Sequence, residues 1–221
     1  NIPVNKALAC ASRVESVLDM PVGMEVQDIP ADPSAAGSAV CFRSAGLTYA
    51  GNAAPSVSGI DFTVRPGETV GIIGSTGSGK TSVVNLIPRF YDATEGAVLV
   101  NGRDVRSYPL EELRGRVAVV PQKAVLFRGT VRSNLLWGNG NATDEELWRA
   151  LELAQAKDFI QQKPGGLDAP VSQNGRNFSG GQRQRLCIAR ALVRGTADIL
   201  ILDDSSSALD YATDAALRAA L

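Results

Sequence analysis

The sequence has 221 residues, of which 44% are hydrophobic and 20% charged, with a net charge of −1. This composition is typical of a folded globular chain with one large domain or two small ones. The nearly balanced charge argues against a nucleic-acid partner. No apolar run approaches the ~20 residues that a membrane helix needs. The chain contains no histidine, which excludes the commonest general base and the commonest metal ligand.

The first 37 residues predict a helix followed by a linker. Apolar residues recur at helical spacing through residues 5–19, and Met20 and Pro21 end that pattern. Residues 21–37 are rich in Pro, Gly, Ala and Asp, a composition typical of linkers. We therefore expect a folded domain that begins near residue 38.

Strands and helices alternate through the rest of the chain. Strands are predicted at residues 40–42, 57–64, 69–73, 97–100, 116–120 and 198–202, and the apolar runs at 69–73 and 198–202 predict buried strands. Helices are predicted at residues 79–86, 143–156, 179–193 and 213–221, the second of them opened by a capping box of Thr143 and Glu146. This alternation predicts an α/β fold with a mainly parallel central sheet.

A glycine-rich stretch between a predicted strand and a predicted helix fits the pattern GxxxxGK[ST]. We call it the phosphate loop; it consists of Gly74, Ser75, Thr76, Gly77, Ser78, Gly79, Lys80 and Thr81. Its glycines let successive backbone N–H groups face inward as an anion nest, and the helix that begins there adds its positive end. In such loops the lysine reaches the β- and γ-phosphates and the hydroxyl binds Mg²⁺. A chance glycine-rich turn is the alternative, but the flanking strand and helix favour a nucleotide site.

A phosphate loop needs a carboxylate to hold the metal, and Asp203 fits this role. It ends the predicted strand at residues 198–202, and parallel sheets bind ligands outside the carboxyl ends of their strands. We therefore expect Asp203 beside Thr81 and the Mg²⁺. The alternative is a solvated acidic residue at a strand end.

Two adjacent glycines open the predicted helix at residues 179–193. Ser179 is a good N-cap, and Gln182 completes a capping box, so a capped helix is one interpretation. Gly180 and Gly181 in the first turn are costly for helix stability, however. They indicate a backbone that another group approaches closely, and a phosphate at the helix N-terminus is the natural candidate.

Together these motifs resemble the nucleotide-binding domain of ABC transporters. Residues 178–182, which we call the signature segment, resemble the family's signature sequence, with Phe178 for the usual leucine. The resemblance covers roughly residues 38–221. It implies a P-loop NTPase core, an N-terminal antiparallel β subdomain and a helical subdomain at about residues 125–182. It also implies that the chain binds ATP and Mg²⁺ and hydrolyses ATP.

The resemblance assigns roles to further residues. Tyr49 matches the aromatic residue that stacks on adenine, although a surface tyrosine is the alternative. Gln122 matches the glutamine that contacts Mg²⁺ and the attacking water, so the implied metal ligands are Thr81, Gln122 and Asp203. The γ-phosphate of ATP bound on an opposite subunit is clamped by the signature residues Ser179, Gly180, Gly181 and Gln182. Residues 207–210 match the loop that crosses to the partner's site, which we call the partner loop.

Within the family the chain resembles the exporter branch. Residues 86–92 are typical of exporters, and residues 6–19 resemble the segment that joins the last membrane helix to the motor. On this interpretation residues 1–37 lead from a membrane domain of the same native chain, and the motor lies at the cytoplasmic face of a membrane. An amphipathic surface helix is the alternative for residues 6–19.

A second departure from the family pattern, after Phe178, lies at the catalytic position. The usual catalytic glutamate is replaced by Asp204, whose side chain is shorter by one methylene. A misplacement of about 1 Å can cost about a hundredfold in rate, so we expect a slow hydrolytic site with Asp204 and Gln122 as its catalytic residues. We favour a heterodimer in which the second nucleotide-binding domain has an intact glutamate; a homodimer that hydrolyses ATP with Asp204 is the alternative.

Two other functions stay open. One is a regulatory module that holds ATP without turning it over, which Asp204 supports. The other is a non-transport ABC ATPase of DNA repair or translation, which is disfavoured because no coiled-coil insertion separates Lys80 from Ser179 and only one motor is present. The sequence does not reveal a transported substrate.

Overall fold

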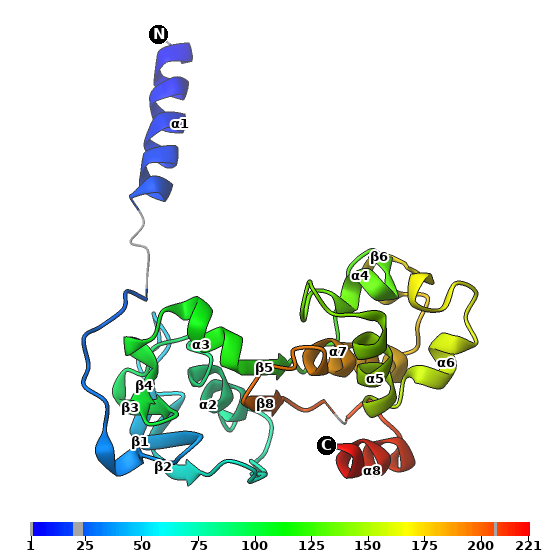
Figure 1. Ribbon diagram of the computed structural model, residues 1–221. Helices are drawn as coiled ribbons and strands as arrows, with labels where there is room; N and C mark the ends of the chain where they lie inside the picture. The colour runs from blue at the N-terminus through cyan, green and yellow to red at the C-terminus, as the bar shows by residue number, and fades with distance from the viewer. Residues whose placement is uncertain (1, 20–23, 206) are drawn as a thin grey trace.

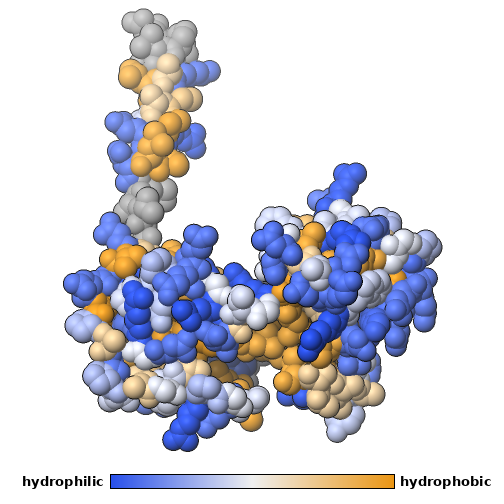
Figure 2. All heavy atoms as spheres, viewed as in Figure 1, coloured by the Kyte–Doolittle hydropathy of each residue, from blue (hydrophilic) through white to orange (hydrophobic). Residues whose placement is uncertain are grey.

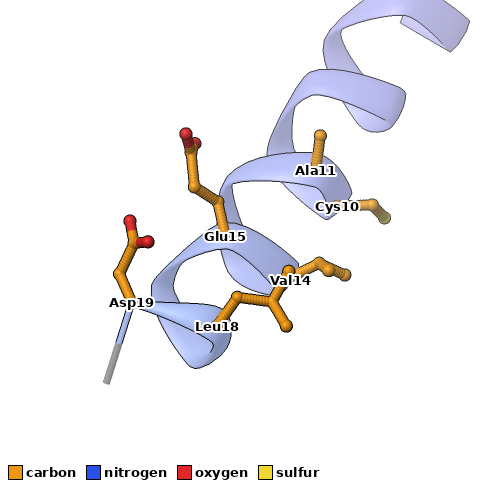
Figure 3. A pocket seen from close by; sticks show the side chains of 6 residues that line it. All are labelled: Cys10, Ala11, Val14, Glu15, Leu18 and Asp19. Atoms are coloured by element: carbon orange, nitrogen blue, oxygen red, sulfur yellow. The ribbon is translucent and has the colours of Figure 1, made fainter. Parts of the chain in front are cut away.

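The computed structural model describes residues 2–19, 24–205 and 207–221. Figure 1 shows two lobes joined by a narrow waist, with helix α1 (Ile2–Leu18) standing apart from both. The predicted helix end at Met20 and Pro21 lies outside the described residues. Residues 6–19 are all exposed. Figure 3 shows Cys10, Val14 and Leu18 lining a shallow apolar depression on this helix.

The first lobe contains an antiparallel sheet in the strand order β2-β1-β3-β4. Its elements are β1 (Val40–Leu47), β2 (Val57–Val64), β3 (Glu95–Val100), β4 (Arg103–Asp104), the helices α2 (Lys80–Leu86) and α3 (Leu110–Arg116), and the 3₁₀ turns η1 (Pro33–Ala35) and η2 (Val105–Ser107). Phe42, Leu86 and Val98 are buried in the core between the sheet and the helices. The expected antiparallel N-terminal subdomain is thereby confirmed.

Strands β5 (Val117–Val120) and β8 (Ile199–Leu202) form the waist in Figure 1. They pair in parallel, with Val120 opposite Leu202. This is the one parallel pair among the described strands, so the α/β class holds while the parallel sheet is reduced to two strands. Because the two strands run in the same direction, their carboxyl ends lie at the same edge of the sheet, which is where parallel sheets bind ligands.

The second lobe is mostly helical. Its elements are α4 (Val131–Leu135), α5 (Asp144–Leu153), α6 (Lys157–Gln161), α7 (Gly180–Leu192), α8 (Tyr211–Ala220), the short strands β6 (Gly129–Thr130) and β7 (Pro170–Val171), and the 3₁₀ turns η3 (Gly166–Asp168) and η4 (Gln173–Gly175). The capping box of Thr143 and Glu146 is present at the start of α5, which ends three residues before the predicted position. The apolar face of α5 is buried against α7 and its neighbours.

The expected buried strand at residues 69–73 is wrong. The segment is irregular, and Ile73 is 98% exposed. In β8 only Ile201 is buried, although the whole strand was expected to be. A run of apolar residues favours burial, but a β-strand also needs a neighbouring strand with which its backbone can form hydrogen bonds. Among the described residues β8 pairs with β5 alone, and no described strand pairs with residues 69–73. Figure 2 shows apolar atoms gathered around the waist as a result.

Candidate functional site

The phosphate loop ends at the N-terminus of α2. Gly79 is the N-cap of this helix with a φ of 88°, in the left-handed region that favours glycine. The side chain of Lys80 folds back over the loop, where Nζ donates to the carbonyl oxygens of Gly74 and Ser75 at 2.8 Å each. A cationic group is thus held within a loop that leads into a helix N-terminus, an arrangement suited to a polyanion.

Thr81 and Asp203 meet although they lie 122 positions apart in the sequence. Thr81 Oγ1 donates to Asp203 Oδ2 at 3.0 Å and lies 3.2 Å from Oδ1. Asp203 follows β8 directly, and its N–H donates to the carbonyl of Val120 at the end of β5. The end of the parallel pair therefore presents a carboxylate to the first turn of α2.

This oxygen pair fits a magnesium ion that is shared with phosphate. Within the described ranges, no group of three or more His, Cys, Asp or Glu side chains could hold a metal alone. Mg²⁺ is usually bound by one or two protein oxygens, with substrate phosphates and waters as the remaining ligands. The hydroxyl of Thr81 and the carboxylate of Asp203 match that limited donor set.

Gln122 and Asp204 form a second polar pair beside the first. Gln122 lies two residues beyond β5, and its Nε2 donates to Asp204 Oδ2 at 3.2 Å. Asp204 has a φ of 48°, a left-handed conformation that aspartate tolerates better than most residues. Both side chains are exposed. The amide of Gln122 thus holds the carboxylate that the sequence suggests as the catalytic group.

Tyr49 contacts α2, the helix that begins at the end of the phosphate loop. Its hydroxyl is 2.9 Å from Ser82 Oγ on α2. Tyr91 meets the Tyr49 ring edge-on, with 4.8 Å between ring centroids. The sequence interpretation missed this second aromatic residue, although Tyr91 belongs to the exporter-like stretch of residues 86–92, which gave a signal that could have led to it.

The signature segment lies in the other lobe. Ser179 caps α7: its Oγ accepts from the N–H of Gln182 at 3.2 Å, and Gln182 Oε1 accepts from the N–H of Ser179 at 3.1 Å. Figure 1 places α7 in the lobe opposite to α2. The structure thus brings the phosphate loop, Asp203, Gln122 and Asp204 to one edge and leaves the signature segment separate from them.

An aromatic anchor fixes the start of the signature segment. Phe178 is 3% exposed, and its ring packs edge-on against Phe159 with 6.4 Å between centroids. Lys163 Nζ lies 4.6 Å from the centroid of the Phe178 ring. Arg183 Nη1 donates to the backbone carbonyl of Phe178 at 2.7 Å. The aromatic residue therefore ties the signature segment to Phe159 of α6 and to Lys163 just beyond that helix. A leucine could not form the cation–π contact with Lys163.

The partner loop packs directly on the signature segment. The Ala208 carbonyl oxygen would lie 2.9 Å from a Cβ at Gly181, whereas a Cβ at Gly180 would meet nothing within 4 Å. The sequence predicted that another group approaches this glycine pair closely. At Gly181 that group is the Ala208 carbonyl of the same chain. Asp210 ends the loop and caps α8; the backbone N–H and the hydroxyl of Thr213 both donate to its carboxylate, which lowers the pKa of Asp210.

We predict that Gly181→Ala displaces the partner loop while Gly180→Ala does not. The new methyl group at position 181 would press on a backbone carbonyl, and overpacking of this kind costs about 1–3 kcal/mol. At position 180 alanine has open space and favours the helix by up to about 1 kcal/mol. Chemical denaturation of both variants measures the difference, and equal stabilities would contradict the contact.

Comparisons with known proteins agree with this geometry. A family model described as ABC transporter matches residues 57–207. An ABC transporter ATP-binding protein of Mycobacterium bovis is 47% identical over 220 residues, which are 98% of this chain and 37% of that protein. An ATP-dependent lipid A-core flippase of Thiobacillus denitrificans is 40% identical over an alignment of 222 residues, which covers 100% of this chain and 38% of the flippase.

A solved structure supports the same assignment. A bacterial Atm1-family ABC exporter with ATP bound superposes with a TM-score of 0.85 at 32% sequence identity, and the match covers 98% of this chain and 38% of the exporter chain. The chain therefore spans less than two fifths of the length of the two relatives named above. By its motifs and by these matches, the chain belongs to the ABC transporter family, as an ATP-binding ATPase domain.

Proposed function

We propose that this chain is the motor domain of an ABC exporter, in which ATP binding closes a dimer of two such domains and hydrolysis reopens it. The observation that carries the proposal is the hydrogen bond between Thr81 and Asp203, which joins the phosphate loop to the end of β8. The exporter and flippase names of the relatives support the transport class. Residues 1–37 serve as the connection to a membrane domain of the same native chain, and residues 38–221 form the motor at the cytoplasmic face.

In the proposed site each group has a separate task. The Lys80 ammonium and the backbone of the phosphate loop bind the phosphates of ATP, and Tyr49 offers its ring to the adenine. Thr81, Asp203 and Gln122 hold Mg²⁺. When bound, the ion supplies positive charge that neutralises the phosphates. In a closed dimer the residues Ser179 to Gln182 bind the γ-phosphate of the nucleotide on the opposite subunit.

We further propose that this site hydrolyses ATP slowly. Asp204 is one methylene shorter than the usual glutamate, and its carboxylate already accepts a hydrogen bond from Gln122 at 3.2 Å. A short side chain held in this way does not reach as far toward an attacking water. The partner domain in this proposal has an intact glutamate and uses the signature segment of this chain.

A second candidate function is a regulatory module that holds ATP without turnover. The same bond between Gln122 and Asp204 favours it, because the proposed base is occupied by a neighbour. Coupled transport separates the two: removing the phosphate-loop lysine abolishes the transport of a motor, whereas a regulatory module alters only its extent.

Thr81 provides a direct test of the metal site. We expect Thr81→Ala in the full-length protein, paired with a partner domain whose catalytic glutamate is replaced by glutamine, to raise the Mg²⁺ concentration for half-maximal ATP turnover at this chain's site by about 10- to 100-fold. Thr81→Ser keeps the hydroxyl and should stay close to the wild type. Titration of turnover with Mg²⁺ at fixed ATP measures this effect. An unchanged Mg²⁺ requirement in Thr81→Ala would remove Thr81 from the metal site.

A further inference from the structure

An arginine with no exposed surface lies just beyond the end of α2. Arg89 is 0% exposed and has a φ of 52°. Its Nε and Nη2 bind both carboxylate oxygens of Asp92 at 2.6 and 3.0 Å. A buried guanidinium is costly unless it is paired and fully hydrogen-bonded. The buried guanidinium of Arg89 therefore depends on specific ion-pair and hydrogen-bond partners.

Two of these contacts reach parts of the chain that are distant in sequence. Arg89 Nη2 donates to the backbone carbonyl of Glu25 at 3.0 Å, and Nη1 donates to the carbonyl of Arg106 at 3.2 Å. The carbonyl of Arg106 also accepts from the N–H of Gln27 at 2.9 Å. Residues 24–36, which we call the N-terminal segment, are thus fastened to the first lobe through the guanidinium of Arg89.

The turn that contains Arg89, directly after α2, is connected to the proposed nucleotide site on two sides. The helix α2 that ends before Arg89 begins with the phosphate-binding candidates Lys80 and Thr81. Tyr91 lies two residues after Arg89 and meets the ring of Tyr49, whose hydroxyl in turn contacts Ser82 on α2. The turn is therefore in contact, through packed side chains, with both the phosphate end and the adenine end of the proposed site.

We propose that Arg89 is a positioning residue that fixes the N-terminal segment relative to the nucleotide site, so that the segment responds to the nucleotide bound there. This inference rests on the proposed ATP site. The planar fork of arginine binds a carboxylate and two carbonyls at once, whereas a lysine keeps the charge but not that geometry. The contacts of Arg89 with Glu25 and Arg106 then carry small movements of α2 to residues 24–36.

The test compares Arg89→Lys with Arg65→Lys in the full-length protein. Arg65 also forms an i,i+3 ion pair, with Glu68 at 3.8 Å, but its side chain is 79% exposed. Hydrogen–deuterium exchange of residues 24–36 is measured with and without Mg²⁺ and the non-hydrolysable analogue β,γ-imido-ATP. The affinity for this analogue is measured in parallel by calorimetry.

In the wild type and in Arg65→Lys we expect the analogue to slow exchange of the Gln27 and Asp32 amides by about tenfold. In Arg89→Lys we expect no such change, with an affinity within about threefold of the wild type. An intact response in Arg89→Lys overturns the inference. A wild type that binds the analogue but leaves residues 24–36 unchanged overturns it without any variant, and a wild type that binds nothing contradicts the proposed function as well.

Discussion

Replacing Lys80 with alanine is expected to lower the ATP turnover at this chain's own site by about 10²–10³-fold, measured in the full-length protein paired with a partner domain whose catalytic glutamate is replaced by glutamine. The Lys80 ammonium lies inside the phosphate loop, 2.8 Å from two backbone carbonyls. It is held there before any nucleotide arrives and needs only to exchange those carbonyls for phosphate oxygens. Removing it takes away the one cationic side chain of the loop, and steady-state turnover at saturating ATP measures the loss.

A matched control for this variant is Lys157→Ala. Lys157 donates to Glu152 at 3.0 Å on the surface of the second lobe. Lys157→Ala therefore measures the effect on turnover of removing a lysine that lies outside the proposed site. Exposed pairs of this kind contribute little to stability, and turnover should stay close to the wild type. If Lys80→Ala keeps wild-type turnover, the phosphate loop is not the site of hydrolysis.

Lengthening Asp204 to glutamate is expected to raise turnover at this site by up to about a hundredfold. Asp204 follows the metal-site candidate Asp203 directly and accepts from Gln122 at 3.2 Å. One added methylene moves the carboxylate about 1 Å farther from the backbone, which is the scale at which catalytic geometry becomes limiting. Phosphate release by Asp204→Glu and by the wild type, both paired with a partner domain whose catalytic glutamate is replaced by glutamine, measures this gain.

Asp204→Asn separates the charge of this residue from its length. It keeps a short side chain that can still pair with Gln122, and it removes the carboxylate. If Asp204 is a weak base, Asp204→Asn is slower than the wild type; if the site is silent, it matches the wild type. A fall in turnover in Asp204→Glu would contradict the interpretation that aspartate limits the rate.

The sequence predicted the local features of the site well because each depends on neighbours in the chain. The capping boxes at Thr143 and Ser179 need only a hydroxyl and a glutamate or glutamine three residues later, and both are present. The proximity of Asp203 to Thr81 depends instead on how parallel strands end, and that rule was sufficient here.

Contacts between distant parts of the chain could not be predicted in the same way. The exposure of Ile73 depends on which strands find partners, and an apolar run carries no information about its neighbours. The buried position of Arg89 depends on a carbonyl 64 positions earlier. The glycine pair indicated that some group approaches this backbone closely, but not that at Gly181 the group is the carbonyl of Ala208. Each of these contacts involves a backbone group, whether in strand pairing or as a single carbonyl, and every residue type has the same backbone groups. The sequence therefore does not indicate which backbone group makes the contact.

The fate of bound nucleotide tests most directly whether this chain is an ATP-binding motor with a slow site. The full-length protein, assembled with its partner domain, is incubated with Mg²⁺ and a photoreactive ATP that cross-links near Tyr49. The nucleotide attached to each chain is then identified as triphosphate or diphosphate over time. We expect this chain to retain triphosphate after the partner site has converted its nucleotide to diphosphate. Diphosphate appearing on this chain as fast as on the partner, or no cross-link to it at all, would contradict the proposed function.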